Sequence, residues 1–241
     1  MKRTFRLFFL LILTVAFGLT AFGQNTSRET LRDQIQARRA ELAALEKEFL
    51  APTAEDRSDF AGLLSQPNTG VIRLLPREKY DDQIVKNKPT ISMRGGGAYY
   101  SFKRLTHEYG RSDIELNSGE LSVGFAGADY GMMMKLGDIA IEDVSSELPA
   151  VRTLLEYVSA KTEADARVEY RKFGMGTDVQ GFMFKNRLPV EVQTTYLLRS
   201  IGFPDSDVAV AFRIARKDTD GSVILAYKLL KDYSPAKTVS R

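Results

Sequence analysis

The chain has 241 residues, with 34 Lys and Arg against 31 Asp and Glu, and it contains no cysteine. The missing cysteine excludes disulfides, thiolate metal sites and thiol catalysis, so an ordinary apolar core has to hold the fold. A net charge of +3 would at first favour a nucleic-acid or membrane partner.

The first 23 residues have the three-part pattern of a secretory signal peptide. Three basic residues open the chain: Lys2, Arg3 and Arg6. An apolar run over residues 7–22 follows, and it is shorter than the roughly 20 residues that cross a bilayer comfortably. We therefore predict export to the periplasm or the cell exterior, with cleavage near Gly23-Gln24 and no stable membrane span afterwards. An uncleaved anchor is the alternative.

Without this leader, the net charge of the chain no longer indicates a basic protein. Three of the 34 basic residues lie in it, which leaves 31 Lys and Arg against 31 Asp and Glu. Nucleic-acid binding depends on a clustered excess of basic side chains, so no nucleic-acid partner is expected.

Residues 24–66 form the next predicted segment, which is helical. Thr26 and Glu29 have the spacing of a capping box, and Thr53 with Asp56 repeats it for a second, shorter helix. Between them an apolar series follows the steps of a coiled-coil seam: Leu31, Ile35, Leu42, Leu45 and Phe49, with Arg38 interrupting. This pattern fits self-association through residues 26–50, and it fits equally well an amphipathic helix that lies on its own domain.

From residue 67 to the C-terminus the dominant period changes from 3.6 to 2, which predicts a β-rich domain over 67–241. Strands are expected over 71–75, 90–94 and 98–105, and a hairpin over 113–125. A helical insertion at about 146–172 interrupts them, with Ser146 and Thr162 as the expected caps.

The clearest strand signal lies near the C-terminus. Large apolar residues alternate with small or charged ones on both sides of the turn DTDG: Val208, Val210, Phe212, Ile214, then Val223, Leu225, Tyr227, Leu229. This pattern predicts a β-hairpin that anchors the core. Overall we expect an α+β fold with a mostly antiparallel, sandwich-like or strongly bent sheet, preceded by an amphipathic N-terminal helix.

The stretch RGGGAYYSFK contains the candidate ligand-binding residues Gly95, Gly96, Gly97, Tyr99, Tyr100 and Lys103. Phosphate loops lead into a helix, whereas this one leads into strand-like sequence. The glycines are therefore interpreted as a bend between strands. The alternative is a binding surface in which a tyrosine beside a lysine stacks on a sugar ring or holds an anion.

Catalytic motifs are sparse. His107 is the only histidine, no G-x-S-x-G elbow accompanies it, and a zinc site without cysteine would need an uncommon ligand set. Asp113, Glu115 and Glu120 lie on the predicted hairpin near His107, and two carboxylates suffice for a glycosidase. No cofactor and no metal site are indicated.

Two functions from different classes remain. The first is an exported periplasmic or cell-envelope protein that binds an unknown ligand or partner without catalysis, which the missing motifs favour. The second is a carboxylate-dependent hydrolase of an envelope glycan or related polymer, which would need Tyr100, His107, Glu108 and the 113–120 acids to meet in one cleft.

Overall fold

A computed structural model describes residues 28–85, 91–110, 112–125 and 127–234. The predicted leader and Thr26 of the first capping box lie outside these residues. The chain divides into two compact units, Met1–Phe49 and Leu50–Arg241. In the first unit residues 28–49 are helical.

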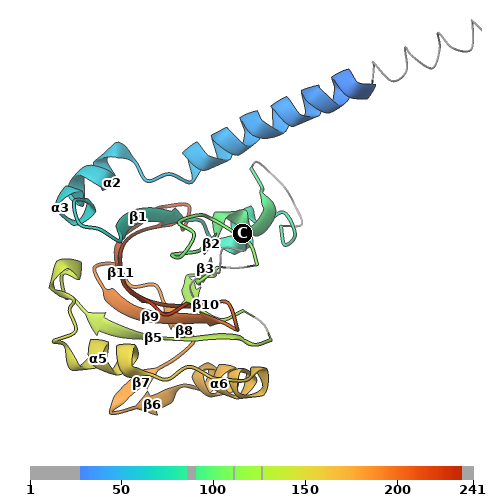
Figure 1. The fold of residues 1–241 in the computed structure, drawn as a ribbon. Coiled ribbons are helices and arrows are strands. Elements are labelled where there is room, and N and C mark those ends of the chain that lie inside the picture. The colour runs from blue at the N-terminus through green and yellow to red at the C-terminus, as the bar shows by residue number, and fades with distance from the viewer. Residues whose placement is uncertain (1–27, 86–90, 111, 126, 235–241) are drawn as a thin grey trace, which may run out of the picture. The chain divides into compact units, whose positions relative to one another are not determined.

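The second unit mixes helices with antiparallel sheets, as the sequence predicts (Figure 1). Its helices are α2 (Ala54–Asp59), α3 (Ala61–Leu64), α4 (Arg77–Tyr80), α5 (Pro149–Glu156) and α6 (Glu163–Met175), with short 3-10 helices η1 (Arg94–Gly97) and η2 (Ile141–Asp143). Its strands are β1 (Thr69–Leu74), β2 (Tyr99–Tyr100), β3 (Ile114–Asn117), β4 (Glu120–Ser122), β5 (Asp129–Gly137), β6 (Thr177–Val179), β7 (Phe182–Phe184), β8 (Arg187–Pro189), β9 (Thr195–Gly202), β10 (Ser206–Lys217) and β11 (Val223–Asp232).

The largest sheet has five strands in the order β1-β11-β10-β9-β5. The hairpin expected near the C-terminus is confirmed as β10–β11, in which Phe212 pairs with Tyr227. The second hairpin is confirmed as β3–β4, and its turn places Ser118 and Gly119 at φ values of 52° and 76°, as a tight two-residue turn requires.

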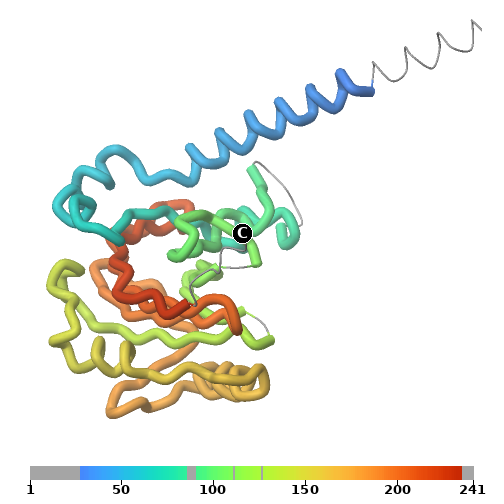
Figure 2. Tube along the Cα trace, viewed as in Figure 1, coloured from blue at the N-terminus to red at the C-terminus, as the bar shows by residue number. Residues whose placement is uncertain are grey.

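Both faces of the five-stranded sheet are covered. The large side chains of β10, such as Phe212, join a core with the side chains of the four-stranded sheet β2-β3-β4-β8. The alanines between them, Ala209 and Ala211, face a second core built with α5 and α6, and the tube trace shows these helices on the opposite side of the sheet (Figure 2). Because both faces are buried, the strand alternates large with small residues instead of apolar with polar ones.

Two of the expected helix caps are confirmed. Thr53 and Asp56 form a complete capping box at α2, and the hydroxyl of Thr162 accepts a hydrogen bond from the N–H of Asp165 at α6. The expected cap at Ser146 is wrong, because α5 begins at Pro149, which takes the first helical position. The fixed φ of proline suits that position and its missing N–H is not needed there.

The glycine run differs most from expectation. The strands predicted over 90–94 and 98–105 shrink to the two residues of β2. The glycines form η1 with φ values of 71°, 62° and 65°, and residues 102–105 form a turn with Leu105 at a φ of 55°. Gly96 also packs tightly, since a Cβ placed on it would lie 2.6 Å from the backbone nitrogen of Asp81. The run bends the chain sharply and presses it against the end of α4.

Candidate functional site

Two adjoining hollows form one cleft beside the four-stranded sheet. The larger has a volume of about 470 Å³ and the smaller about 220 Å³. Both are lined by Gly110, Ser112, Gly124, Phe125 and Asp129. The cleft is therefore one continuous concave surface of the size that suits a small ligand.

Glu115 on β3 is fixed in the larger hollow by three donors. Its Oε1 accepts from Nη1 of Arg77 at 3.0 Å and from the hydroxyl of Tyr99 at 2.8 Å. Its Oε2 accepts from the hydroxyl of Ser122 at 2.9 Å. Both oxygens are thus occupied by charged or neutral donors, which hold the carboxylate in one position.

Arg77 is the cation of this network. It lies on α4, 38 residues before Glu115 in the sequence, and its Nε also donates to Asp81 at 3.0 Å. Burial by itself lowers the pKa of Arg77, but the hydrogen bond to Asp81 and the negative charge nearby raise it above its usual value. The described contacts use two of the five guanidinium N–H groups, so donors remain at the wall of the larger hollow.

Aromatic rings surround the Tyr99 side chain. The ring of Tyr109 stands edge-on to it at a centroid distance of 5.3 Å, and the ring of Phe125 does so at 5.5 Å. The Arg77 guanidinium lies 5.4 Å from the same ring. Burial and the hydrogen bond to Glu115 raise the pKa of Tyr99 well above its usual value, so its hydroxyl stays a donor at neutral pH.

The larger hollow is also lined by groups with little internal bonding. The guanidinium of Arg187 comes only within 3.7 Å of Glu120 and its side chain is 62% exposed. Tyr170 and Asn186 line the same hollow. The hydroxyl oxygen of Ser112 is buried without a hydrogen-bond partner among the described residues. Arg187, Tyr170 and Asn186 therefore offer one cation and several neutral polar atoms to a ligand, whereas the Ser112 oxygen is not accessible.

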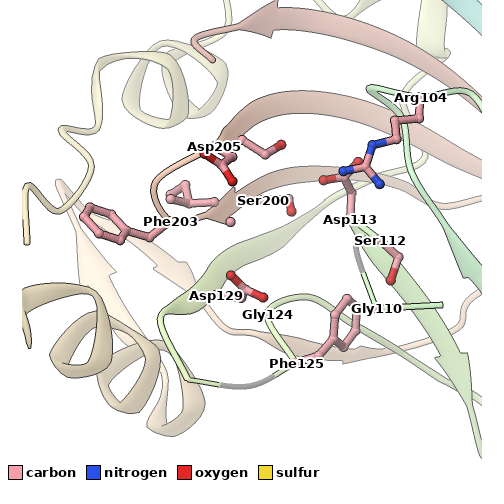
Figure 3. A pocket seen from close by; sticks show the side chains of 13 residues that line it. Arg104, Gly110, Ser112, Asp113, Gly124, Phe125, Asp129, Ser200, Phe203 and Asp205 are labelled. Atoms are coloured by element: carbon pink, nitrogen blue, oxygen red, sulfur yellow. The ribbon is translucent and has the colours of Figure 1, made fainter. Parts of the chain in front are cut away.

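The smaller hollow is acidic (Figure 3). Asp113 accepts a hydrogen bond from the Phe102 N–H at 2.8 Å and another from the Ser101 hydroxyl at 3.2 Å. Burial nevertheless raises the pKa of Asp113, and it also raises the pKa of Asp129, which faces the same space. Neither carboxyl has a cation bonded to it in the described contacts, so burial disfavours their charged forms.

The structure places the site residues that the sequence suggested in different parts of the second unit. Tyr99 and Glu115 meet in the larger hollow and Asp113 lines the smaller one, while Tyr100 is buried in the core between the two sheets. Glu120 faces Arg187 at the surface. The candidate residues therefore do not meet as one catalytic cluster.

The remaining candidates bond to protein groups elsewhere. His107 donates from Nε2 to the Arg73 carbonyl at 2.7 Å, and burial lowers its pKa although that hydrogen bond opposes the shift. Lys103 donates to the Asp205 carbonyl at 3.1 Å, and Glu108 pairs with Arg104. Gly95, Gly96 and Gly97 are buried against protein atoms.

Sequence reasoning missed several cleft residues: Arg77, Tyr109, Ser122, Phe125, Asp129, Tyr170, Asn186 and Arg187. They come from separate stretches of the chain, and none belongs to a short motif. The one local signal was the alternation over 113–117, which places Asp113 and Glu115 on the same side of a strand.

No protein-family model, no curated protein and no solved structure matches this chain. None of the helices within the described residues has both the length and the apolar character needed to cross a membrane. The described residues also contain no group of three or more His, Asp or Glu side chains arranged to hold a metal ion.

Proposed function

We propose that this chain is an exported, non-enzymatic binding protein of the cell envelope and that its cleft holds a small sugar-like ligand with a negative charge. The observation that carries the proposal is the bonding of Glu115. Three donors occupy its two oxygens, so it serves better as a rigid anchor for Arg77 and Tyr99 than as a group that must exchange a proton or attack a substrate.

The other walls of the cleft suit this ligand class. The rings of Tyr109 and Phe125 can flank the apolar face of a sugar, while the Asn186 side chain can bond its hydroxyls. Arg187 and the unused donors of Arg77 match a carboxylate, because a guanidinium binds that group through paired N–H bonds.

Binding of an acidic oligosaccharide tests the proposal. We expect short oligogalacturonates to bind in calorimetry, and neutral malto-oligosaccharides to bind at least about tenfold more weakly, since one charged hydrogen bond contributes about 1.5–3 kcal/mol. Arg187→Ala should weaken oligogalacturonate binding by a similar factor. Arg167→Ala on the outer surface of α6, where Arg167 pairs with Glu163, is the matched control and should change nothing. Equal affinity of both probes, or no binding of either, contradicts the proposed ligand class.

A carboxylate-dependent hydrolase is the second candidate, and one observation favours it. Asp113 and Asp129 line the smaller hollow and both have a raised pKa, as a general acid needs. Release of reducing ends from the same oligosaccharides, abolished by Asp129→Asn, would support it. No release between pH 4 and pH 8 would reject it.

For the first unit we propose self-association through residues 26–50. The helix over 28–49 carries an apolar stripe whose members are more than half exposed: Leu31, Ile35, Leu42 and Leu45. An amphipathic helix needs a partner for such a stripe. For the second unit we infer a sandwich-like packing of the two large sheets, which the core cluster shared by their side chains supports.

A further inference from the structure

We propose that the N-terminal helix pairs with a second copy of this chain in antiparallel orientation. The proposal rests on the proposed self-association and adds the geometry of the pair. Its basis is the position of the seam and flanking charges on the helix over residues 28–49. The helix is described by itself, so every partner contact below follows from heptad geometry.

The seam has six positions in the regular alternation of four and three residues: Leu31, Ile35, Arg38, Leu42, Leu45 and Phe49. In heptad terms, residues 35, 42 and 49 are a positions and residues 31, 38 and 45 are d positions. An antiparallel pair places an a residue opposite a d residue in each layer. Centred on Ala40, it matches all six positions, residue 31 with residue 49 of the second copy, 35 with 45, and 38 with 42.

Arg38 distinguishes the two orientations. In a parallel pair the two copies of Arg38 share one layer, which places like charges together in the seam. In the antiparallel pair each Arg38 lies opposite Leu42, and the two arginines are offset by four residues, or about 6 Å along the axis. Arg38 also binds Glu41 on its own helix at 2.7 Å, so its charge is directed to the flank of the seam.

The flanking charges favour the same orientation. In a parallel pair Glu41 at a g position faces Glu46 at an e position of the second copy, and this repulsion occurs twice. In the antiparallel pair e positions face e positions. Arg32 then faces Glu46 twice, with opposite charges. The central Arg39 faces its own copy once, and Glu41 does the same on the g side, so two attractions oppose two single repulsions, whereas the parallel pair has its two repulsions without these attractions.

Charge reversal at one residue separates the alternatives. Glu46→Arg turns both Arg32–Glu46 pairs of the antiparallel dimer into repulsions. We therefore expect the dimer to dissociate at least fivefold more readily, measured by sedimentation equilibrium on the full chain purified after expression and any natural processing. In a parallel dimer the same change replaces both repulsions with Glu41 by attractions and strengthens association. The double variant Arg32→Glu, Glu46→Arg should restore the antiparallel dimer. Glu29→Arg, on the outer face of the helix, is the matched control and should leave association unchanged.

Cross-linking gives an independent reading, because the chain contains no cysteine of its own. Arg39→Cys lies at the centre of the antiparallel pair, so a short bis-maleimide should join two copies of this variant. Ile35→Cys should not cross-link with itself, since its two copies lie about 15 Å apart along the axis, whereas a parallel pair places them in one layer. A dimer that Glu46→Arg strengthens, or that cross-links through Ile35→Cys, overturns the antiparallel geometry. A chain that stays monomeric at all concentrations overturns self-association itself, and with it the pairing.

Discussion

Two arginines of the second unit, Arg199 and Arg77, bind carboxylates through similar contacts in different surroundings. Arg199 holds Asp207 through two bonds of 2.8 Å and 2.9 Å, and its Nη1 donates to the carbonyls of Leu154 and Tyr157. The ring of Tyr233 covers its guanidinium at 4.0 Å. The Arg199 side chain is 2% exposed, against 23% for Arg77.

The difference lies in what remains for a ligand. Four of the five Arg199 N–H groups bond to the protein, and these bonds tie β9 and β10 to the end of α5. Arg77 keeps donors at the wall of the larger hollow. A closed network stabilises the fold, whereas an open one of similar composition can bind.

The largest expected effect comes from breaking the closed network. Arg199→Met leaves Asp207 buried without its cation, and the loss of one partner of a buried pair typically costs about 3–5 kcal/mol. Arg77→Met should cost less, about 1–3 kcal/mol, because Glu115 keeps two other donors, the buried Asp81 keeps the N–H of Gln83, and water can reach the cleft. Urea unfolding of both variants measures the difference.

The control for this comparison is the double variant Arg199→Met, Asp207→Leu. It removes the stranded charge and should recover part of the stability that the single change loses. Equal losses for Arg199→Met and Arg77→Met would contradict the distinction between the closed and the open network.

The next effect concerns Gly96, which packs against the backbone of Asp81, a partner of Arg77. Gly96→Ala forces a Cβ to within 2.6 Å of the Asp81 backbone at a positive φ, and we expect the unfolding free energy to fall by about 2–4 kcal/mol. Gly181→Ala also has a positive φ but meets nothing within 4 Å, so it should cost only about 1 kcal/mol. Thermal unfolding compares the two, and similar melting temperatures would show that the close approach is unimportant.

A smaller effect on stability is expected from the pH dependence of Asp113, which precedes β3, compared with Glu115 within it. Glu115 has an arginine, whereas Asp113 is buried without one and has a raised pKa. The folded protein therefore keeps the Asp113 proton to a higher pH than the unfolded chain. Stability should fall as the pH rises from the unfolded pKa of about 3.9 through the raised folded pKa. In Asp113→Asn this decline should be reduced, which urea titrations from pH 4 to pH 7 can measure; an identical decline in both proteins would assign it to other groups.

The smallest effect is that of His107, which has no carboxylate partner in its described contacts. Its folded pKa is lowered by burial, so stability should be complete above the unfolded pKa of about 6.5 and should decrease as the pH falls through the lowered folded pKa. Because the chain has a single histidine, its NMR imidazole signals report this pKa directly. A measured value above about 6.5 would contradict the interpretation, and His107→Gln should remove the dependence.

The sequence was informative where structure depends on neighbours along the chain. The turn at 117–119 and the Thr53 and Thr162 caps were predictable, because each depends on hydrogen bonds or φ angles within about four residues. The alternation in β10 predicted which side chains enter the core. The misplaced start of α5 and the strand expected over 90–94 show where a proline or a glycine run outweighs local propensity, and the strand expected over 98–105 is cut short by the turn at 102–105.

The cleft could not be predicted in this way. Arg77 meets Glu115 across 38 residues, and the smaller hollow joins Asp113 to Ser200 from the far sheet. Such contacts arise only when the two sheets pack together, because each side chain by itself fits an ordinary solvated or buried position.

By itself, the sequence determined the secondary structure around its clearest patterns and the α+β class. Tertiary structure alone decided that Gly96 packs against the end of α4, that Glu115 is bonded by Arg77 and Tyr99, and that His107 faces a backbone carbonyl. The physical reason is the distance along the chain over which each interaction acts. Hydrophobic periodicity and capping act over a few residues, whereas burial and charge pairing depend on which distant segments the packed core brings together.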